Sequence, residues 1–234
     1  VKFRMIAIAL LSATMPFTAK AQDKVEASVG ADFVSNYIWR GTDCGGVSIQ
    51  PSMGVSYKGL SLAAWGSVGI DKEDAREIDL TLGYNTGGFN VSVTDYWFSY
   101  HKEDGGYTGD YFKYGAHSTI HIFEATLGYD FGPLALSWNT YFAGDDYTKE
   151  NGDRAYSTYV GISAPFKLGG LDWSAEVGLT PWEGAYANKF NVTNLTLKAE
   201  KEIKFTNSFS LPTFAQVTFN PHTQGAYFVF GVSF

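Results

Sequence analysis

Twelve short segments of this chain alternate apolar and polar residues, and the connections between them alternate between short and long. Residues 47–57 show the alternation best, because Val47, Ile49, Met53 and Val55 are separated by polar or small residues. Successive side chains of a β-strand point to opposite faces of the sheet. Each segment therefore predicts a strand with one apolar face and one polar face, and no segment predicts a long helix.

The connections indicate how these strands join. Five are short and six are mostly longer, as expected when an even number of antiparallel strands has short turns at one end and longer loops at the other. We therefore predict an all-β fold, a 12-stranded antiparallel up-and-down transmembrane β-barrel, with its first strand at 25–39. Barrels of 10 or 14 strands are alternatives, since the tenth and eleventh segments, on either side of 206–208, alternate poorly.

Residues 1–21 have the features of a cleaved signal peptide. Lys2 and Arg4 precede an apolar run, and Ala19-Lys20-Ala21 fits a cleavage site before Gln22. A short membrane anchor is the alternative, but the run falls below the roughly 20 residues of a spanning helix. The predicted barrel domain is 22–234, exported through the periplasm to the bacterial outer membrane.

Charge and cysteine content exclude some functions. The chain has 17 basic and 24 acidic residues, and three of the basic ones precede Gln22, which leaves 17 − 3 = 14 against 24, a formal charge of −10. This excess of acid argues against nucleic acid as a partner. Cys44 is the only cysteine, so the chain cannot form an internal disulfide.

Alternation alone leaves the direction of the apolar face open, because a soluble barrel or sandwich would bury it as a core. Alternating connection lengths and aromatic residues near strand ends favour lipid on the outside. Asp95 is an exception, since it shares a face with Val91 and Val93. Either a bulge shifts the register before Asp95, or Asp95 lies above the hydrocarbon.

With the apolar faces outward, ten charged residues become candidates for lining the lumen. An acid-rich wall favours cations and polar solutes over anions, and Arg40 and Lys198 could reach across to a carboxylate. The alternative is that these charges pair and fill the interior, because barrels of this size lie between filled and open ones. The candidates are Glu26, Asp32, Arg40, Glu77, Asp79, Glu124, Asp172, Glu176, Lys198 and Glu200.

Aromatic residues in the longer connections form a second candidate set. Together with nearby Asp and Gly residues they are typical of an external rim that binds sugars or other ring-bearing solutes. Packing within the loops, or anchoring at a membrane interface, explains the same residues. The candidates are Tyr107, Tyr111, Tyr114, Trp182 and Tyr186.

No catalytic, metal or cofactor site is predicted. The histidines His101, His117, His121 and His222 lack the His–Ser context of outer-membrane phospholipases, and no GxSxG motif occurs. His117 and His121 on one strand would lie about 13 Å apart, too far for one metal ion. We therefore do not expect an enzyme.

Three segments resemble the TorF-type porin family. The run 33–41, Phe-Val-Ser-Asn-Tyr-Ile-Trp-Arg-Gly, resembles that family's first strand, and 62–67 and 77–84 resemble its third and fourth strands. The closing segment 228–234, ending at Phe234, resembles the terminal insertion signal of outer-membrane barrels. The resemblance implies a porin in the outer membrane, recognised by the barrel-assembly machinery through its last strand.

The resulting hypothesis is an outer-membrane porin or narrow channel for passive diffusion of small polar solutes, with cations favoured. Its expected partners are outer-membrane lipid, the barrel-assembly machinery and small solutes, without a cofactor. A barrel plugged by its own side chains, with a structural or surface-binding role, is the main alternative. A lipid-processing enzyme is a weaker one.

Overall fold

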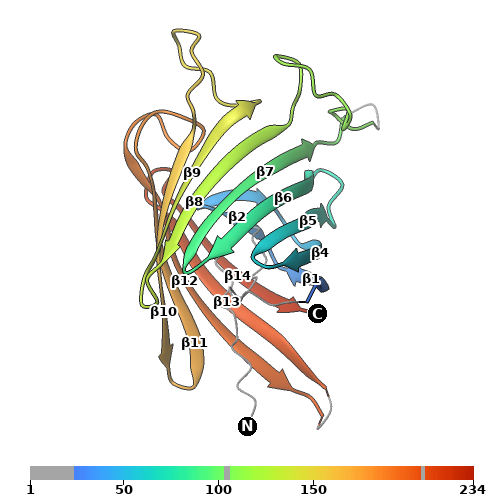
Figure 1. Ribbon diagram of the computed structural model, residues 1–234, viewed down its shortest axis with the longest axis vertical. Coiled ribbons are helices and arrows are strands. Elements are labelled where there is room, and N and C mark those ends of the chain that lie inside the picture. Colours follow the sequence, from blue (N-terminus) through green and yellow to red (C-terminus); the bar gives the residue numbers. More distant parts are fainter. Residues whose placement is uncertain (1–23, 103–105, 207–208) are drawn as a thin grey trace.

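The computed structural model describes residues 24–102, 106–206 and 209–234, and these form a closed antiparallel barrel of twelve strands (Figure 1). The predicted fold class and strand number are confirmed, and the alternatives of 10 and 14 wall strands are wrong. The predicted signal peptide lies outside the described residues. No helix that could cross a membrane occurs in the described part of the chain.

The wall strands follow one another around the barrel in chain order, and β1 closes it by pairing with β14. A separate two-stranded sheet, β2 (Tyr37–Trp39) with β3 (Thr42–Gly45), lies between β1 and β4 in the chain. The wall consists of β1 (Glu26–Val34), β4 (Ser48–Tyr57), β5 (Leu60–Gly69), β6 (Arg76–Thr86), β7 (Phe89–Ser99), β8 (Ile122–Asp130), β9 (Ala135–Gly144), β10 (Thr158–Leu168), β11 (Leu171–Thr180), β12 (Asn191–Lys204), β13 (Ser210–Asn220) and β14 (Gly225–Ser233).

Five short connections lie at one end of the barrel. Lys58 and Gly59, which join β4 to β5, have positive φ angles of 49° and 87°. Two residues with positive φ form the tight hairpin turn whose twist matches that of antiparallel strands. The opposite end carries five longer connections, of which residues 100–121 form the longest, and the short β13–β14 connection, 221–224. The predicted alternation of connection lengths is thus observed; residues 207–208 of the predicted β12–β13 turn lie outside the described part.

The faces of the wall strands have the predicted polarity. Along β6, Glu77, Asp79 and Thr81 are buried, whereas the intervening Ile78 and Leu80 are exposed. Leu80, Leu127 and Val177, on three separate strands, are 39%, 49% and 39% exposed. Apolar side chains therefore cover the outside and polar ones fill the inside, the reverse of a soluble barrel with an apolar core.

The barrel closes between the two ends of the described chain. Asp32, Phe33 and Val34 of β1 pair with Ser233, Val232 and Gly231 of β14. At the final residue, the Phe234 nitrogen donates to the Ala31 carbonyl over 3.0 Å. The last strand is therefore what seals the cylinder.

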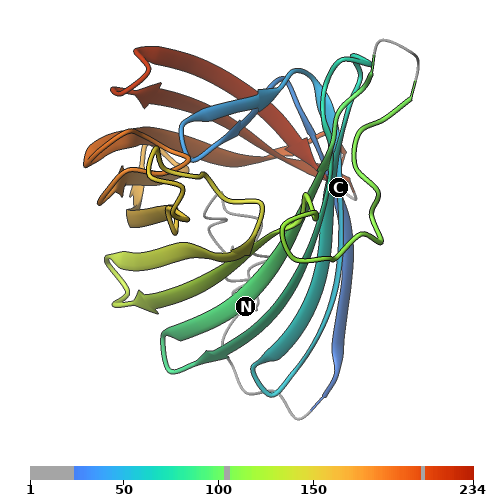
Figure 2. The same cartoon turned by 90° about the horizontal axis from the view of Figure 1, so that it is seen from above.

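The first strand is shorter than predicted. The expected strand 25–39 ends at Val34, and residues 37–45 leave the wall to form the β2–β3 hairpin. Figure 2 shows this hairpin lying across the inside of the barrel, viewed from above. All three residues of β2 are buried, whereas Thr42 and Asp43 of β3 are exposed. We call residues 37–45 the lumen hairpin.

Asp95 does face outward, and no register shift occurs next to it in β7. The bulge predicted as one explanation is therefore absent from β7, and the long β7–β8 connection supplies partners for Asp95. The His121 Nδ1 atom lies 2.7 Å from one Asp95 carboxylate oxygen, and the Tyr114 hydroxyl donates to the other over 3.3 Å. The connection thus compensates a carboxylate on the apolar surface.

Candidate functional site

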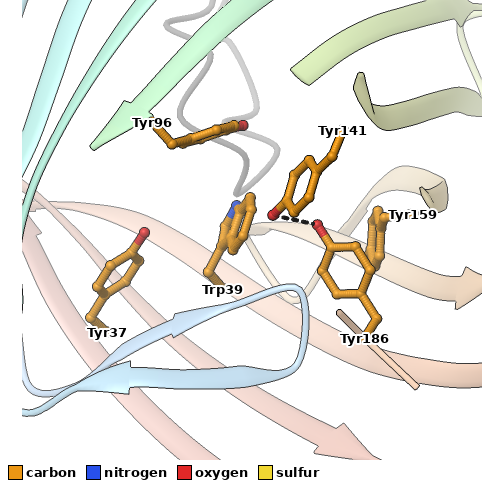
Figure 3. Packing of buried hydrophobic residues seen from close by; sticks show 6 residues of the cluster. All are labelled: Tyr37, Trp39, Tyr96, Tyr141, Tyr159 and Tyr186. Atoms are coloured by element: carbon orange, nitrogen blue, oxygen red, sulfur yellow. Dashed lines mark hydrogen bonds between the residues drawn. The ribbon is translucent and has the colours of Figure 1, made fainter. Parts of the chain in front are cut away.

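The lumen hairpin packs against two clusters of buried side chains. Ile38 points to the wall near the β1–β14 junction, where it joins Val34, Phe214 and Val229. Tyr37 and Trp39, on the other face of β2, point to the middle of the barrel. There they meet four tyrosines carried by the wall and by the β11–β12 connection: Tyr96, Tyr141, Tyr159 and Tyr186 (Figure 3).

Arg40, at the tip of the lumen hairpin, crosses the interior to a carboxylate. Its two terminal nitrogens lie 2.5 and 2.8 Å from the two Glu124 oxygens, and both side chains are at most 2% exposed. Two parallel N–H donors on one carboxylate form the bidentate geometry in which arginine binds most strongly. Burial is the largest single influence on the pKa of Arg40 and lowers it, but Glu124 together with Tyr186 and Tyr96 raises that pKa by more, so the guanidinium stays charged.

Aromatic rings surround the same guanidinium. The Arg40 carbon that bears the three nitrogens lies 4.3 Å from the Trp39 ring centre and 4.8 Å from that of Tyr159. The Arg40 Nη1 atom also donates to the Tyr186 hydroxyl over 2.5 Å. A cation near desolvated aromatic faces is stabilised by the ring quadrupoles. The site therefore combines a carboxylate, a hydroxyl and ring faces around one cation.

The partners of Arg40 are themselves fixed by other groups. The Tyr96 hydroxyl donates to Glu124 over 3.0 Å, and the Tyr186 hydroxyl donates to the Tyr141 oxygen over 3.0 Å. The Tyr159 hydroxyl donates to Glu176 over 2.5 Å. Burial raises the pKa of Tyr186 to about 12, so its hydroxyl keeps its proton at neutral pH. Networks of this kind hold side chains in one geometry.

The turn of the hairpin is fitted closely to the wall. Arg40 and Gly41 have positive φ angles of 51° and 80°, which close a two-residue turn between Trp39 and Thr42. A Cβ atom at Gly41 would lie 1.9 Å from the Thr193 carbonyl oxygen. The Gly41 carbonyl accepts a hydrogen bond from the Asn220 side chain over 3.0 Å. Only glycine fits here, because both the backbone angle and the space exclude a side chain.

A pair of buried acids lies beside the hairpin. Glu77 and Asp79 are 4% and 2% exposed, and neither Asp79 oxygen has a hydrogen-bond partner in the described structure. Burial, followed by the charge of Glu77, raises the pKa of both Tyr37 and Cys44 on the hairpin. Buried carboxylates without donors favour a cation or a proton nearby. This pair therefore binds a proton or a cation in preference to an anion.

The other lumen candidates are spread along the barrel. Asp32 is half-buried, and Glu26 is exposed at the start of β1. Asp172 pairs with Lys167 next to the β10–β11 turn. Lys198 does not cross the lumen, because its Nζ atom lies 2.5 Å from Glu200 on the same strand. The structure thus brings together five candidates, Arg40, Glu77, Asp79, Glu124 and Glu176. The other five lie outside this group.

The five external aromatic candidates do not form one rim. Tyr107 packs on Arg76 and His101, whereas Tyr111 and Tyr114 pack around His121.

Trp182 lies on the outer surface against Trp138, with ring centres 5.9 Å apart. The external position expected for Tyr186 is wrong, because the β11–β12 connection turns inward and leaves this residue only 9% exposed. Tyr186 therefore belongs to the interior site.

Several interior residues were missed from the sequence. Tyr96, Tyr141 and Tyr159 occupy inward positions of their strands, but an aromatic residue on a polar face gives no sign of which partner it meets. The usable signal was Gly41, since Arg-Gly between Trp39 and Thr42 is compatible with a two-residue hairpin turn. The apolar alternation continues through Trp39, so the pattern predicts a longer first strand instead of this turn.

Comparisons with known proteins add no assignment. No family model matches this chain, and no curated protein matches it in sequence. Among the described residues, no group of three or more His, Cys, Asp or Glu side chains could hold a metal ion. The function is therefore inferred from the geometry of the barrel interior.

Proposed function

We propose that this protein is an outer-membrane porin of narrow bore, related to the TorF-type porins, that passes small polar solutes and favours cations. The observation that carries the proposal is the polarity of the closed barrel: apolar side chains cover its outside, and carboxylates and hydroxyls face its interior. Only a closed barrel satisfies its backbone within lipid without helices. Insertion would use the barrel-assembly machinery, which recognises the last strand ending at Phe234.

Cation preference is supported by the balance of charge near the lumen hairpin. Four acids, Glu77, Asp79, Glu124 and Glu176, lie in the interior near one guanidinium, that of Arg40. Rings of carboxylates select cations in pores. Both Asp79 oxygens are buried without a hydrogen-bond partner, so Asp79 would accept a cation once the lumen hairpin moves aside.

A test measures the reversal potential of the reconstituted protein under a potassium chloride gradient in planar bilayers. We expect stable cation-selective steps for the wild type and a reversal potential closer to zero for Asp79→Asn. Glu73→Gln, an exposed residue of the β5–β6 connection, is the matched control and should leave selectivity unchanged. Equal selectivity of wild type and Asp79→Asn would contradict the role of the acid pair.

A plugged structural barrel is the second candidate, and the lumen hairpin favours it, because the hairpin and its aromatic neighbours occupy the middle of the barrel. Bilayers that stay silent with folded wild type and with a variant lacking residues 36–46 would support this candidate over transport.

Catalysis is not proposed. Both ring nitrogens of His121 are occupied, by Asp95 and by the Tyr111 carbonyl oxygen, each at 2.7 Å. A histidine with both nitrogens bound is not free to act as a general base. Release of fatty acid from phospholipid by the purified protein would contradict this view.

A further inference from the structure

Most of the groups that bind the Arg40 guanidinium lie outside the lumen hairpin. Glu124 lies on β8, Tyr159 on β10 and Tyr186 on the β11–β12 connection; of the ring and carboxylate partners, Trp39 alone is on the hairpin. We call Glu124, Tyr159 and Tyr186 the guanidinium site. Because Tyr96, Tyr141 and Glu176 fix these three side chains from the wall, the site would persist if Arg40 left it.

The chemistry of the site is specific for a planar cation. A carboxylate that accepts two parallel N–H bonds matches the fork of a guanidinium, and the Tyr159 ring supplies a face for it. An ammonium group would lose the bidentate geometry, and a quaternary ammonium would lose every hydrogen bond. The site therefore distinguishes guanidinium compounds from other cations of the same charge.

Arg40 is neither fully hydrogen-bonded nor free of backbone strain. Its Nε atom is buried and has no acceptor in the described structure. The turn that presents it places a non-glycine residue at φ 51°, in the left-handed region. The strained turn weakens the binding of the tethered guanidinium relative to a free one, which needs no such turn.

We infer that the guanidinium site is a binding site for small solutes bearing a guanidinium group, and that Arg40 occupies it as a tethered substitute. An entering guanidinium compound exchanges with Arg40 and releases the tip of the lumen hairpin. The inference deepens the proposed porin function, on which it rests for the access of solute to the interior. Since a tethered group competes at an effective concentration of about millimolar order, removing Arg40 should strengthen solute binding.

The test is chemical rescue of Arg40→Ala by guanidinium chloride, well below denaturing concentration. The readout is the thermal unfolding midpoint in detergent, which depends on binding and requires no conductance. At about ten times Kd, guanidinium should raise the midpoint of Arg40→Ala by about 3–6 °C. Tetramethylammonium chloride at equal ionic strength should not raise it. No difference between the two salts would overturn the inference.

Two variants control for other effects of guanidinium. Arg154→Ala removes an arginine whose Nη2 atom donates to a carbonyl, that of Gly144, instead of a carboxylate, and it should show no rescue. The double variant Arg40→Ala/Glu124→Gln should lose the rescue, because the bidentate acceptor is gone. Rescue in either variant would overturn the inference.

A measurement on the wild type keeps the inference testable if Arg40→Ala does not fold. Exchange of Arg40 for free guanidinium should loosen the hairpin and raise the alkylation rate of Cys44 on β3, whereas tetramethylammonium should leave it unchanged. Equal rates in both salts would contradict the inference. Absence of conductance in every variant, with rescue intact, would contradict the porin function and not the site.

Discussion

Arg40 and Glu124 lie 84 positions apart in the chain, yet they form a buried bidentate ion pair inside the barrel, with nitrogen–oxygen distances of 2.5 and 2.8 Å. One partner sits at the tip of the lumen hairpin and the other on the wall strand β8. The pair is therefore one of the contacts that hold residues 37–45 across the interior. Its consequences for stability and conductance can be measured separately.

The ion pair should show strong coupling in a double-mutant cycle. Arg40→Met or Glu124→Met alone leaves one buried charge without its partner and should lower the free energy of unfolding by about 3–5 kcal/mol. The double variant should cost much less than the sum, since two apolar side chains replace the pair. Urea unfolding of the refolded barrel measures all four forms. Additive losses would show that the two residues act independently.

Gly41→Ala should displace the lumen hairpin. The new Cβ atom would lie 1.9 Å from the Thr193 carbonyl oxygen, and the backbone at φ 80° disfavours alanine. We expect larger or more frequent conducting steps in planar bilayers than for the wild type. Gly169→Ala is the matched control, since Gly169 has φ +61° and open space around it, so it carries the backbone strain of about 1–2 kcal/mol without the clash. Identical conductance of both variants would contradict the close fit of the lumen hairpin against the barrel wall.

The Cys44 thiol should react slowly and with an unusual pH profile. Burial, then the charge of Glu77, raises the pKa of this thiol, so little thiolate exists near neutral pH. The alkylation rate should keep rising about tenfold per pH unit beyond pH 8.5, where an ordinary cysteine levels off. In Gly41→Ala the released hairpin should return the pKa towards its usual value. A wild-type profile that levels off near pH 8.5 would argue against burial of the hairpin.

The His121–Asp95 contact should stabilise the outer surface of the barrel. His121→Leu leaves the outward Asp95 carboxylate without its closest donor and should cost about 1–3 kcal/mol of unfolding free energy. Adding Asp95→Leu should recover most of that loss, because the uncompensated charge is removed. Thermal unfolding in detergent compares the three proteins. A double variant less stable than His121→Leu would mean that Asp95 has another essential partner.

Much of the barrel followed from local sequence patterns. Alternation in segments such as Ile78–Tyr84 specifies a strand and its two faces, and a Lys-Gly or Asn-Thr-Gly-Gly connection specifies a turn, because both depend on neighbours in the chain. The interior site did not follow in the same way. Whether Arg40 meets Glu124, or Tyr186 turns inward, depends on strands that are neighbours only after the barrel has closed.

The ends of the strands show the same limit. Trp39 continues the apolar alternation of β1, so the departure of the chain from the wall after Val34 is invisible to the pattern. Asp95 interrupts the apolar face of its strand, and this interruption marks a residue that needs a partner. The partner, His121, lies in the long β7–β8 connection, whose course no periodicity predicts.

Lipid contact of the exposed apolar face is the claim on which the membrane account depends. In a Cys44→Ser background, a fluorophore attached to Leu80→Cys, Leu127→Cys or Val177→Cys should be quenched by phospholipids with brominated acyl chains, while one at Glu73→Cys in the β5–β6 connection should not. The same quenching is expected on all three strands. Absence of quenching at Leu80, Leu127 and Val177 in a folded, reconstituted barrel would contradict the account.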